Sequence, residues 1–341
     1  MAVPRISVLL LAHHRKEFVA EAVASVDRSA RALEGVERIV VKSFVDPSID
    51  DPIERSGWRL ISGAPDPLGA KVALGLRNCT GDVVTFLEDD DAYEPERLPR
   101  VSRAFGEDPA LSYYRNGQRF VGPDGQTPAQ PDGKAARNLQ RLGSVRAGAG
   151  ALTSIVPELS RIDPDFNLSS IAVRRDAILG ELSALEPLNA AVDSAVFYAA
   201  LRSGGGVRID AERLTRYRVH SVNASLLSRS GAPEAMAEYL RYQQRFLTDF
   251  EPTVRLTTEK GPEPARRLAQ SALAGSQLLF DLLSPGTPRR RIAGDLGRFW
   301  RRSPAAKLRD RPDLSYYGLL GLIAPGASRR SYARRRGIPN P

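Results

Sequence analysis

The 341-residue sequence predicts an α/β fold, in which a mostly parallel sheet is flanked by helices and followed by a helical C-terminal extension. Short apolar runs bounded by charge alternate with helical segments over the first hundred residues, which is typical of βαβ units with buried parallel strands. From about residue 234 the apolar residues recur at a helical period instead. The composition, 42% apolar and 26% charged, is that of an ordinary globular protein.

The first half of the chain contains four expected strands and three expected helices. The strands are continuous apolar runs, and in the helices the apolar residues recur at intervals of three and four. We expect strands at 5–12, 37–43, 58–62 and 81–88, and helices at 18–26, 68–77 and 95–105. Pro95 suits the first turn of the last of these helices.

The second half is less regular. Residues 112–125 indicate a strand and a turn, and residues 122–150, rich in Gly, Pro, Gln, Asn and Arg, indicate a mobile loop. Further along the pattern predicts a strand passing into a short helix at 168–179, a helix closed by glycines at 192–205, strands at 206–210 and 214–220, and helices at 235–250 and 265–283. We therefore expect two parts, a sheet domain over 1–225 and a helical, basic extension over 226–341.

The charge is concentrated at one end of the chain. From residue 289 onward the chain contains fourteen Arg and Lys and three Asp, so this tail has a net charge of +11. Because the whole chain has a net charge of +9, the residues before the tail carry about −2. The lone Cys79 excludes an intramolecular disulfide and fits a reducing compartment. No apolar run approaches the roughly 18 residues that span a bilayer. We expect a cytoplasmic protein, peripheral at the inner face of the cell membrane.

An acidic cluster, "FLEDDDAYEP" at 86–95, closes the fourth expected strand with Glu88, Asp89, Asp90 and Asp91. Ligands of parallel sheets bind just beyond the carboxyl ends of the strands, where "AHHR" of the first strand should also lie. The cluster has three interpretations. Asp91 could cap the following helix, or the acids could form a calcium loop, although the glycine of an EF-hand is absent. We favour the third, a divalent cation completed by phosphates and water.

Three segments, "ISVLLLAHHR", "LGAKVALGLRNCTGDVVTFLEDDDAYEPERL" and "YRVHSVNAS", resemble the family 2 inverting glycosyltransferases, which have the Rossmann-like GT-A fold. The resemblance covers about residues 4–225 and is most specific over 81–98. It implies transfer of a sugar from a nucleotide-diphosphate donor to a hydroxyl, on a glycan or a lipid-linked acceptor, with Mn²⁺ or Mg²⁺ as cofactor. A fixed cation would offset the charge of the departing diphosphate.

The resemblance also implies roles for residues of the cluster. Glu88, Asp90 and Asp91 match the D-x-D-D positions of the family. Asp90 would hold the metal, while Glu88 and Asp89 would face the donor.

Other donor-binding residues are expected around the cluster. Ala12 and His13, at the end of the first strand, would lie near the nucleotide. Lys71 would reach the diphosphate as a point charge, or else be a solvated lysine in the first turn of its helix.

The family places a general base at the start of a later helix, and Asp193 fits that position. An inverting transfer needs a carboxylate that takes the proton of the acceptor hydroxyl as its oxygen attacks. Glu186 and Asp176 are alternatives, and Asp193 could also cap its helix.

Two further positions follow an apolar strand. His220 would complete the metal shell or touch the diphosphate, or be structural. Of Arg174 and Arg175, one would clamp phosphate or acceptor while the other is solvated; we assign Arg174 to the donor.

The sequence departs from the family at three places. The first strand ends in Ala12 and the histidines 13 and 14 instead of small polar residues. The second strand ends in Lys42 and Ser43, where an Asp is usual, with Asp46 shortly after. The first acid of the motif is Glu88. These departures bear on the nucleotide more than on the chemistry.

The basic tail has apolar residues beside its charges, "FW" at 299–300 and a run at 316–324. This favours an anionic membrane surface over nucleic acid as its partner, because aromatics and leucines accompany the arginines; a solvated helical face is the remaining alternative. For the whole chain, the alternatives to an enzyme are a catalytically silent nucleotide-sugar or glycan binding protein on the same fold, and an arginine-tailed nucleic-acid binder.

Overall fold

The computed structural model describes residues 3–13, 15–129, 142–220, 232–302 and 312–335. The strands are β1 Ile6–Ala12, β2 Glu37–Lys42, β3 Arg59–Ile61, β4 Val83–Glu88, β5 Ala92–Tyr93, β6 Leu111–Val121, β7 Val145–Ala147, β8 Ile171–Arg174 and β9 Gly206–Arg218. The helices of the sheet domain are α1 Lys16–Ala30, α2 Pro47–Arg55, α3 Leu68–Asn78, α4 Arg97–Glu107, α6 Val156–Leu159, α7 Asp176–Leu179, α8 Leu182–Leu185 and α9 Val192–Arg202. The C-terminal helices are α10 Ala232–Lys260, α11 Glu263–Leu283, α12 Arg289–Arg302, α13 Pro312–Ile323 and α14 Pro325–Arg335.

These strands form one mixed sheet in the order β3-β2-β1-β4-β8-β6-β9-β5, with β7 beside β9. The four strands β3, β2, β1 and β4 are parallel, as expected. Beyond them β8 runs antiparallel to both β4 and β6, and β9 is parallel to β6. The α/β fold is therefore confirmed. The four strands from the N-terminal part of the chain pair only in parallel with one another, whereas the rest of the sheet is mixed.

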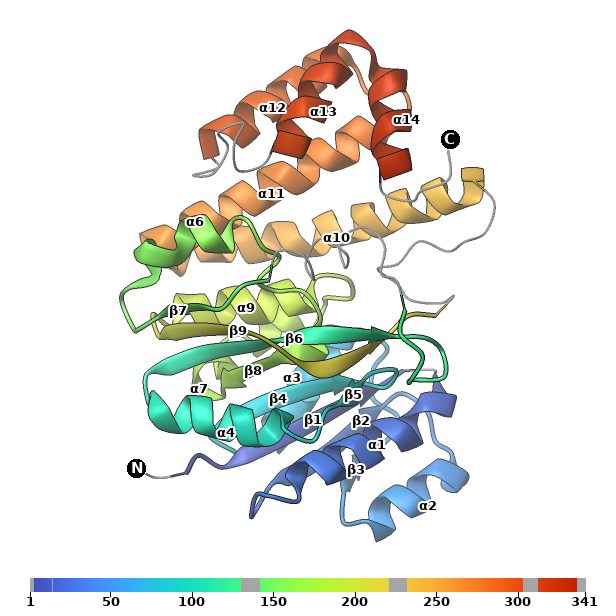
Figure 1. Cartoon of the computed structure of the whole chain (residues 1–341), viewed down its shortest axis with the longest axis vertical. Helices are drawn as coiled ribbons and strands as arrows, with labels where there is room; N and C mark the ends of the chain where they lie inside the picture. Colours follow the sequence, from blue (N-terminus) through green and yellow to red (C-terminus); the bar gives the residue numbers. More distant parts are fainter. Residues whose placement is uncertain (1–2, 14, 130–141, 221–231, 303–311, 336–341) are drawn as a thin grey trace.

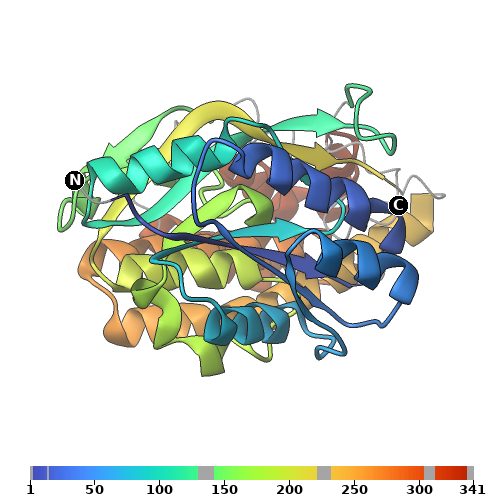
Figure 2. The ribbon, with the colours of Figure 1, turned by 90° about the horizontal axis from the view of Figure 1, so that it is seen from below.

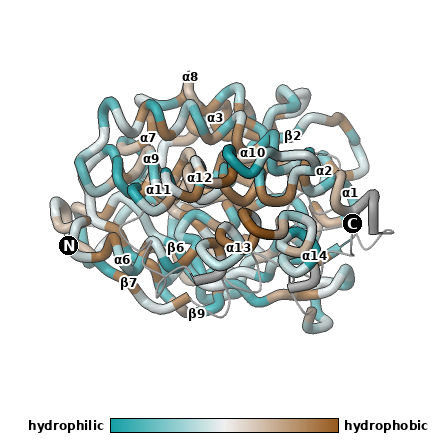
Figure 3. The backbone as a smooth tube through the Cα atoms, turned by 90° about the horizontal axis from the view of Figure 1, so that it is seen from above, coloured by the Kyte–Doolittle hydropathy of each residue, from teal (hydrophilic) through white to brown (hydrophobic). Residues whose placement is uncertain are grey.

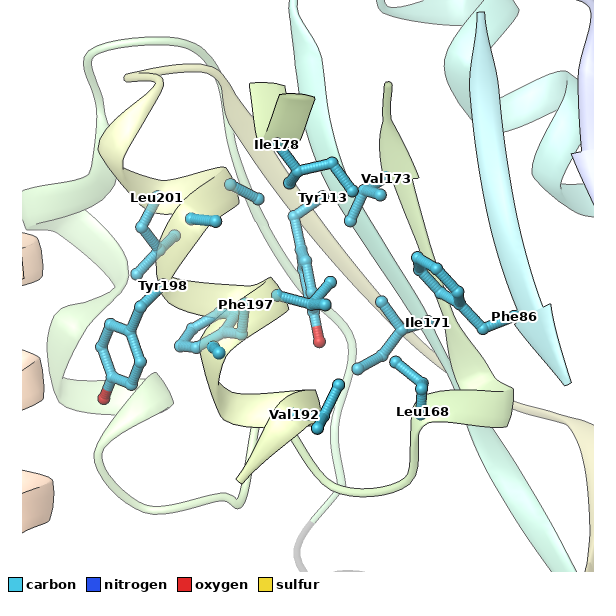
Figure 4. Packing of buried hydrophobic residues seen from close by; sticks show 14 of the residues in the cluster. Phe86, Tyr113, Leu168, Ile171, Val173, Ile178, Val192, Phe197, Tyr198 and Leu201 are labelled. Carbon is cyan, nitrogen blue, oxygen red and sulfur yellow. The ribbon is translucent and has the colours of Figure 1, made fainter. Parts of the chain in front are cut away.

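Helices cover the two faces of the sheet (Figures 1 and 2), and a cluster of buried apolar side chains lies on each face. Successive side chains of a strand point to opposite faces. Leu9 of β1 accordingly joins the cluster with α3 and α9, while Leu10 joins the one with α1 and α4. Figure 4 shows the larger cluster, where the Tyr113 ring of β6 meets Phe197 of α9 edge-on at 4.9 Å between centroids.

The first two C-terminal helices belong to the same core. Phe250 and Val254 of α10 and Leu268 of α11 are buried in the cluster that contains Leu9 and Phe197. Helices α12–α14 instead pack on α11 in a smaller cluster of their own, at the end of the molecule farthest from the sheet (Figure 1). The expected boundary at 225/226 lies outside the described residues, as do residues 130–141 of the loop expected at 122–150, whose described part contains strand β7.

Three local expectations need correction. Helix α2, between the second and third strands, was not expected, although Asp46 accepts a hydrogen bond from the Ser48 N–H and Pro47 opens the helix. Helix α4 begins at Arg97, so Pro95 lies before its first turn. The two strands expected over 206–220 are one strand, β9, with register shifts against β6 near Gly117.

Candidate active site

The acidic cluster and the end of β1 lie at the same edge of the sheet, as expected. Parallel strands β1 and β4 pair so that Leu11 is opposite Glu88, and the Asp89 N–H donates to the Leu11 carbonyl at 3.1 Å. The carboxyl ends of both strands therefore open together, at the place where sheets of this kind bind ligands.

Asp89 is fully buried and ties the cluster to the chain after β1. Its Oδ2 accepts the His13 N–H at 2.8 Å, and its Oδ1 lies 2.7 Å from Nη2 of Arg15. Burial raises the pKa of Asp89 to about 6 although the Arg15 charge opposes the rise. Asp89 thus holds the backbone of His13 in place.

Asp90 has the most varied partners in the cluster. Its Oδ2 lies 2.9 Å from His220 Nε2 and also accepts from Nη1 of Arg15. Its backbone carbonyl accepts from Nε of Arg218 at 2.8 Å. The Phe18 ring packs against the imidazole of His220, with 5.5 Å between centroids. One carboxylate oxygen therefore faces both a histidine and an arginine.

Asp91 does not cap a helix. It is buried, and its carboxylate accepts from Asn167 Nδ2 at 2.8 Å and from the Arg218 N–H at 3.0 Å, while the N-cap of α4 is Glu96. Burial and the neighbouring Asp90 raise the pKa of Asp91 to about 7. Asp91 fastens the cluster to β9.

Glu88 is half-buried at the end of β4, and its backbone N–H donates to Ser169 Oγ at 3.0 Å. Burial raises its pKa well above the usual range, and the charges of Asp90, Asp91 and Asp193 raise it further. A cation placed among the four acids would therefore stabilise their ionised forms.

Two arginines that the sequence did not single out supply positive charge. Arg15 bridges Asp89 and Asp90 from the start of α1. Arg218 is buried and donates to the carbonyls of Asp90 and Pro123 and to Glu21 Oε2 at 2.5 Å. A sequence signal existed for Arg218, because it stands two residues before His220, at the end of β9.

Lys71 and His13 meet beside the cluster. Lys71 is buried, so it is not a solvated lysine; its Nζ donates to the Asp66 carbonyl at 2.7 Å and lies 3.0 Å from His13 Nδ1. Burial lowers the pKa of Lys71. Ala12 is the buried last residue of β1, and its carbonyl accepts the Ser43 N–H at 3.3 Å.

Of the three base candidates, Asp193 is the one whose charge acts on Glu88. It lies in the first turn of α9, where its Oδ1 accepts the Ser194 N–H at 2.8 Å, and the N-cap is Ala191. Glu186 instead forms a half-exposed ion pair with Arg77. Asp176 opens α7, after the end of β8 that is remote from the cluster.

The structure places Arg174 away from the site. Strand β8 is antiparallel to β4, so Arg174 pairs with Val83 at the amino end of β4, while the acids follow its carboxyl end. The guanidinium lies over the Phe105 ring, 5.3 Å from the centroid. Arg175 follows at that same end, where its N–H donates to the Asp82 carbonyl.

The pairing of Asp90 and His220 fits two ligands of one divalent cation. Neighbouring ligands of an octahedral ion, at bonds of about 2.1 Å, lie about 3 Å apart, and the two atoms are 2.9 Å apart. Within the described residues no group of three or more His, Cys, Asp or Glu converges to hold a metal. An ion held by Asp90 and His220 alone would need phosphate and water to complete its shell.

Comparison with known proteins gives a family match over the first part of the chain. Residues 7–155 match the family described as glycosyl transferase family 2. An uncharacterized glycosyltransferase of Nostoc sp. is 22% identical over 261 residues, which are 72% of this chain and 75% of that protein.

The fold resembles solved glycosyltransferase structures. Residues 1–349 of S. aureus TarS in complex with UDP match with a TM-score of 0.58 and 14% identity, over 97% of this chain and 91% of theirs. This chain spans 55% of the longer TarS structure. The mannosyltransferase PcManGT of Pyrobaculum calidifontis, in complex with GDP-Man and Mn²⁺, matches with a TM-score of 0.58 and 14% identity, over 99% and 85%. These likenesses confirm the expected GT-A fold.

Proposed function

We propose, from the match of residues 7–155 to glycosyl transferase family 2, that this enzyme transfers a sugar from a nucleotide-diphosphate donor to a hydroxyl with inversion. The observation that carries the proposal is the pairing of Asp90 with His220 at the carboxyl end of β4. The charge of Asp193 acts on Glu88, which supports the proposal that this candidate base serves the same site.

Asp90 and His220 would hold Mn²⁺ or Mg²⁺. The ion, when bound, supplies positive charge against the diphosphate that leaves. PcManGT, a structural relative, was solved with Mn²⁺ and GDP-Man, which supports this assignment. Arg218 donates from its side chain to the Asp90 carbonyl and from its backbone N–H to the Asp91 carboxylate, and these bonds hold the segment that carries Asp90.

His13 and Lys71 would bind the donor beside the metal ligands. Asp89 fixes the His13 backbone, and the His13 ring faces the Lys71 ammonium. Burial lowers the pKa of Lys71. A phosphate oxygen beside its ammonium group would raise this pKa again and so stabilise the charged form of the lysine. Glu88, at the end of β4, would face the sugar or the ribose.

Asp193 would act as the general base. It takes the proton of the acceptor hydroxyl while that oxygen bonds to the anomeric carbon, and the bond from this carbon to the diphosphate oxygen breaks on the opposite face. The acceptor would be a glycan or a lipid-linked hydroxyl.

Arg15 would adjust the charge of the site. It contacts the same Asp90 oxygen as His220, so it competes with a cation for that oxygen. We expect Arg15 to leave Asp90 when metal and donor bind, and to turn its guanidinium towards a phosphate.

The test is donor hydrolysis and transfer across a panel of UDP- and GDP-sugars with Mn²⁺ or Mg²⁺. Asp193→Asn should abolish turnover and leave donor binding, measured by thermal shift, within about twofold, because the amide cannot take a proton. Glu186→Gln is the matched control and should keep wild-type turnover. If the protein binds donors but turns over none of them, it is instead a catalytically silent nucleotide-sugar binding protein.

A further inference from the structure

Helix α13 presents an apolar stripe to solvent. Tyr316, Leu319 and Ile323 are 56%, 40% and 75% exposed, and their spacing of three and four residues puts them on one side of the helix. The described part of the chain has six exposed large hydrophobic residues. Three of them are in this stripe, and a fourth is Trp300 of α12, which is 41% exposed.

Trp300 lies beside this stripe. Its Nε1 donates to Ser315 Oγ at 3.0 Å, one residue before Tyr316. At the other end Nη2 of Arg289 donates to the Ile323 carbonyl at 3.2 Å. Helices α12 and α13 are therefore antiparallel neighbours, and Trp300, Tyr316, Leu319 and Ile323 form one surface, here called the α12–α13 face.

The other side of α13 is already packed. Leu314 and Tyr317 are buried in the cluster on α11. Gly318 is so close to α12 that a Cβ there would lie 2.8 Å from Leu296 Cδ1. The fold thus anchors α13 through its inner side and leaves the outer apolar side in water, an arrangement that marks interaction surfaces.

Helix α12 puts positive charge beside the α12–α13 face, although Arg291 and Arg298 form ion pairs with the buried Asp281 and Asp295. Helix α12 has six arginines, all exposed, and one acid, Asp295, which is buried: Arg289, Arg290, Arg291, Arg298, Arg301 and Arg302. Two copies of this chain would therefore repel one another if they paired through it. The charge instead complements an anionic surface.

We propose that the α12–α13 face docks on an anionic lipid bilayer. Leu319 and Ile323 would enter the acyl boundary, the rings of Trp300 and Tyr316 would lie at headgroup level, and the arginines of α12 would meet the lipid phosphates. In the described part of the chain no helix has the length and apolar character needed to cross a bilayer, which agrees with a helix lying along the surface.

The position of these helices suits such a contact. They form the end of the molecule away from the sheet, and Figure 3 views the molecule from that end. The acidic cluster lies instead at the carboxyl ends of β1 and β4. The docking surface is thus separate from the proposed catalytic site, and the inference does not rest on the proposed transfer.

The test is cosedimentation of the full chain with vesicles of phosphatidylcholine, with and without phosphatidylglycerol. We expect binding to the anionic vesicles that falls with salt, and at least a fivefold loss in the double variant Leu319→Ser/Ile323→Ser. Arg301→Gln/Arg302→Gln should weaken binding and its salt dependence. Val3→Ser, another exposed apolar residue, should bind like wild type.

Circular dichroism and melting curves establish that each variant folds, and donor hydrolysis without vesicles should be equal in all of them. Absence of wild-type binding to anionic vesicles, or equal binding by wild type and Leu319→Ser/Ile323→Ser, overturns the proposal. Duplex DNA that binds as tightly as the vesicles, and is unaffected by that double variant, assigns the arginines to nucleic acid and also overturns it.

Discussion

Nε2 of His220 lies 2.9 Å from Oδ2 of Asp90 across 130 residues of sequence. Strand β5, directly after the acidic cluster, explains the approach, because Ala92 pairs with Arg216 near the end of β9. The same short strand brings Arg218 against Asp90 and Asp91. Two residues of antiparallel pairing thus assemble the site from both halves of the domain.

The first prediction concerns the proposed metal ligand. Asp90→Asn should remove the Mn²⁺-dependent part of the thermal shift given by UDP or GDP, because a neutral amide binds a hard cation poorly. The measurement is the melting temperature with nucleotide, with and without Mn²⁺. Asp82→Asn, at the other end of β4, is the control and should keep the full shift.

The second prediction concerns Arg15. Arg15→Gln should tighten Mn²⁺ binding to the nucleotide-free protein by about tenfold, since loss of a charged hydrogen bond of roughly 1.4 kcal/mol releases Asp90. It should raise the KM for donor as well. Titration calorimetry measures the first effect, with Lys16→Gln as the neighbouring control. Unchanged Mn²⁺ affinity would show that Arg15 does not compete for the site.

The third prediction concerns Arg218, whose buried guanidinium reaches Glu21, Pro123 and the Asp90 carbonyl. Arg218→Met should lower the free energy of unfolding by about 3 kcal/mol, because the buried Asp90 carbonyl and the partly buried acceptors of Glu21 and Pro123 lose their donor. Urea unfolding measures the loss. Arg218→Lys should recover part of it but not the geometry, so a lysine variant as stable and active as wild type would contradict this role.

The fourth prediction is a dependence of stability on pH in the C-terminal helices. Burial raises the pKa of Asp295 from 3.8 to about 6, against the opposing charge of Arg298. Below pH 4 both folded and unfolded chains hold this proton. As pH rises to 6 only the unfolded chain ionises freely, so folding loses about 1–3 kcal/mol.

Asp295→Asn should therefore stabilise the protein at pH 7 and be neutral near pH 4. Melting temperatures of both proteins between pH 4 and 7 test this, because the difference between them reports on Asp295 together with Asp281, the neighbouring carboxyl that also raises its pKa. A variant less stable than wild type at pH 7 would mean that the ion pair with Arg298 outweighs burial.

The sequence was sufficient for features encoded locally. Continuous apolar runs marked β1 and β4, and the acids directly after β4 could be placed at the ligand edge because parallel strands end together. Helix α2 could also have been found, since Asp46 and Pro47 are an N-terminal helix signal.

Features that depend on strand direction and distant pairing were not predictable from one sequence. Arg174 is expected at the donor because it follows an apolar strand, but β8 runs antiparallel to β4, so Arg174 lies at the amino end of β4. Arg15 and Arg218 contact the cluster across 75 and 128 residues, and for Arg218 the only signal is its place two residues before His220.

The sheet order has a further consequence for how this protein can be divided. The family match ends at residue 155, and strands β8 and β9 come after it, yet β8 lies between β4 and β6 in the sheet. Helices α10 and α11 complete the core on one face of this sheet. A fragment ending where the family match ends would leave the backbone edge of β4 open to pairing with other chains. The segment that matches the family, residues 7–155, is thus smaller than the unit that must fold together.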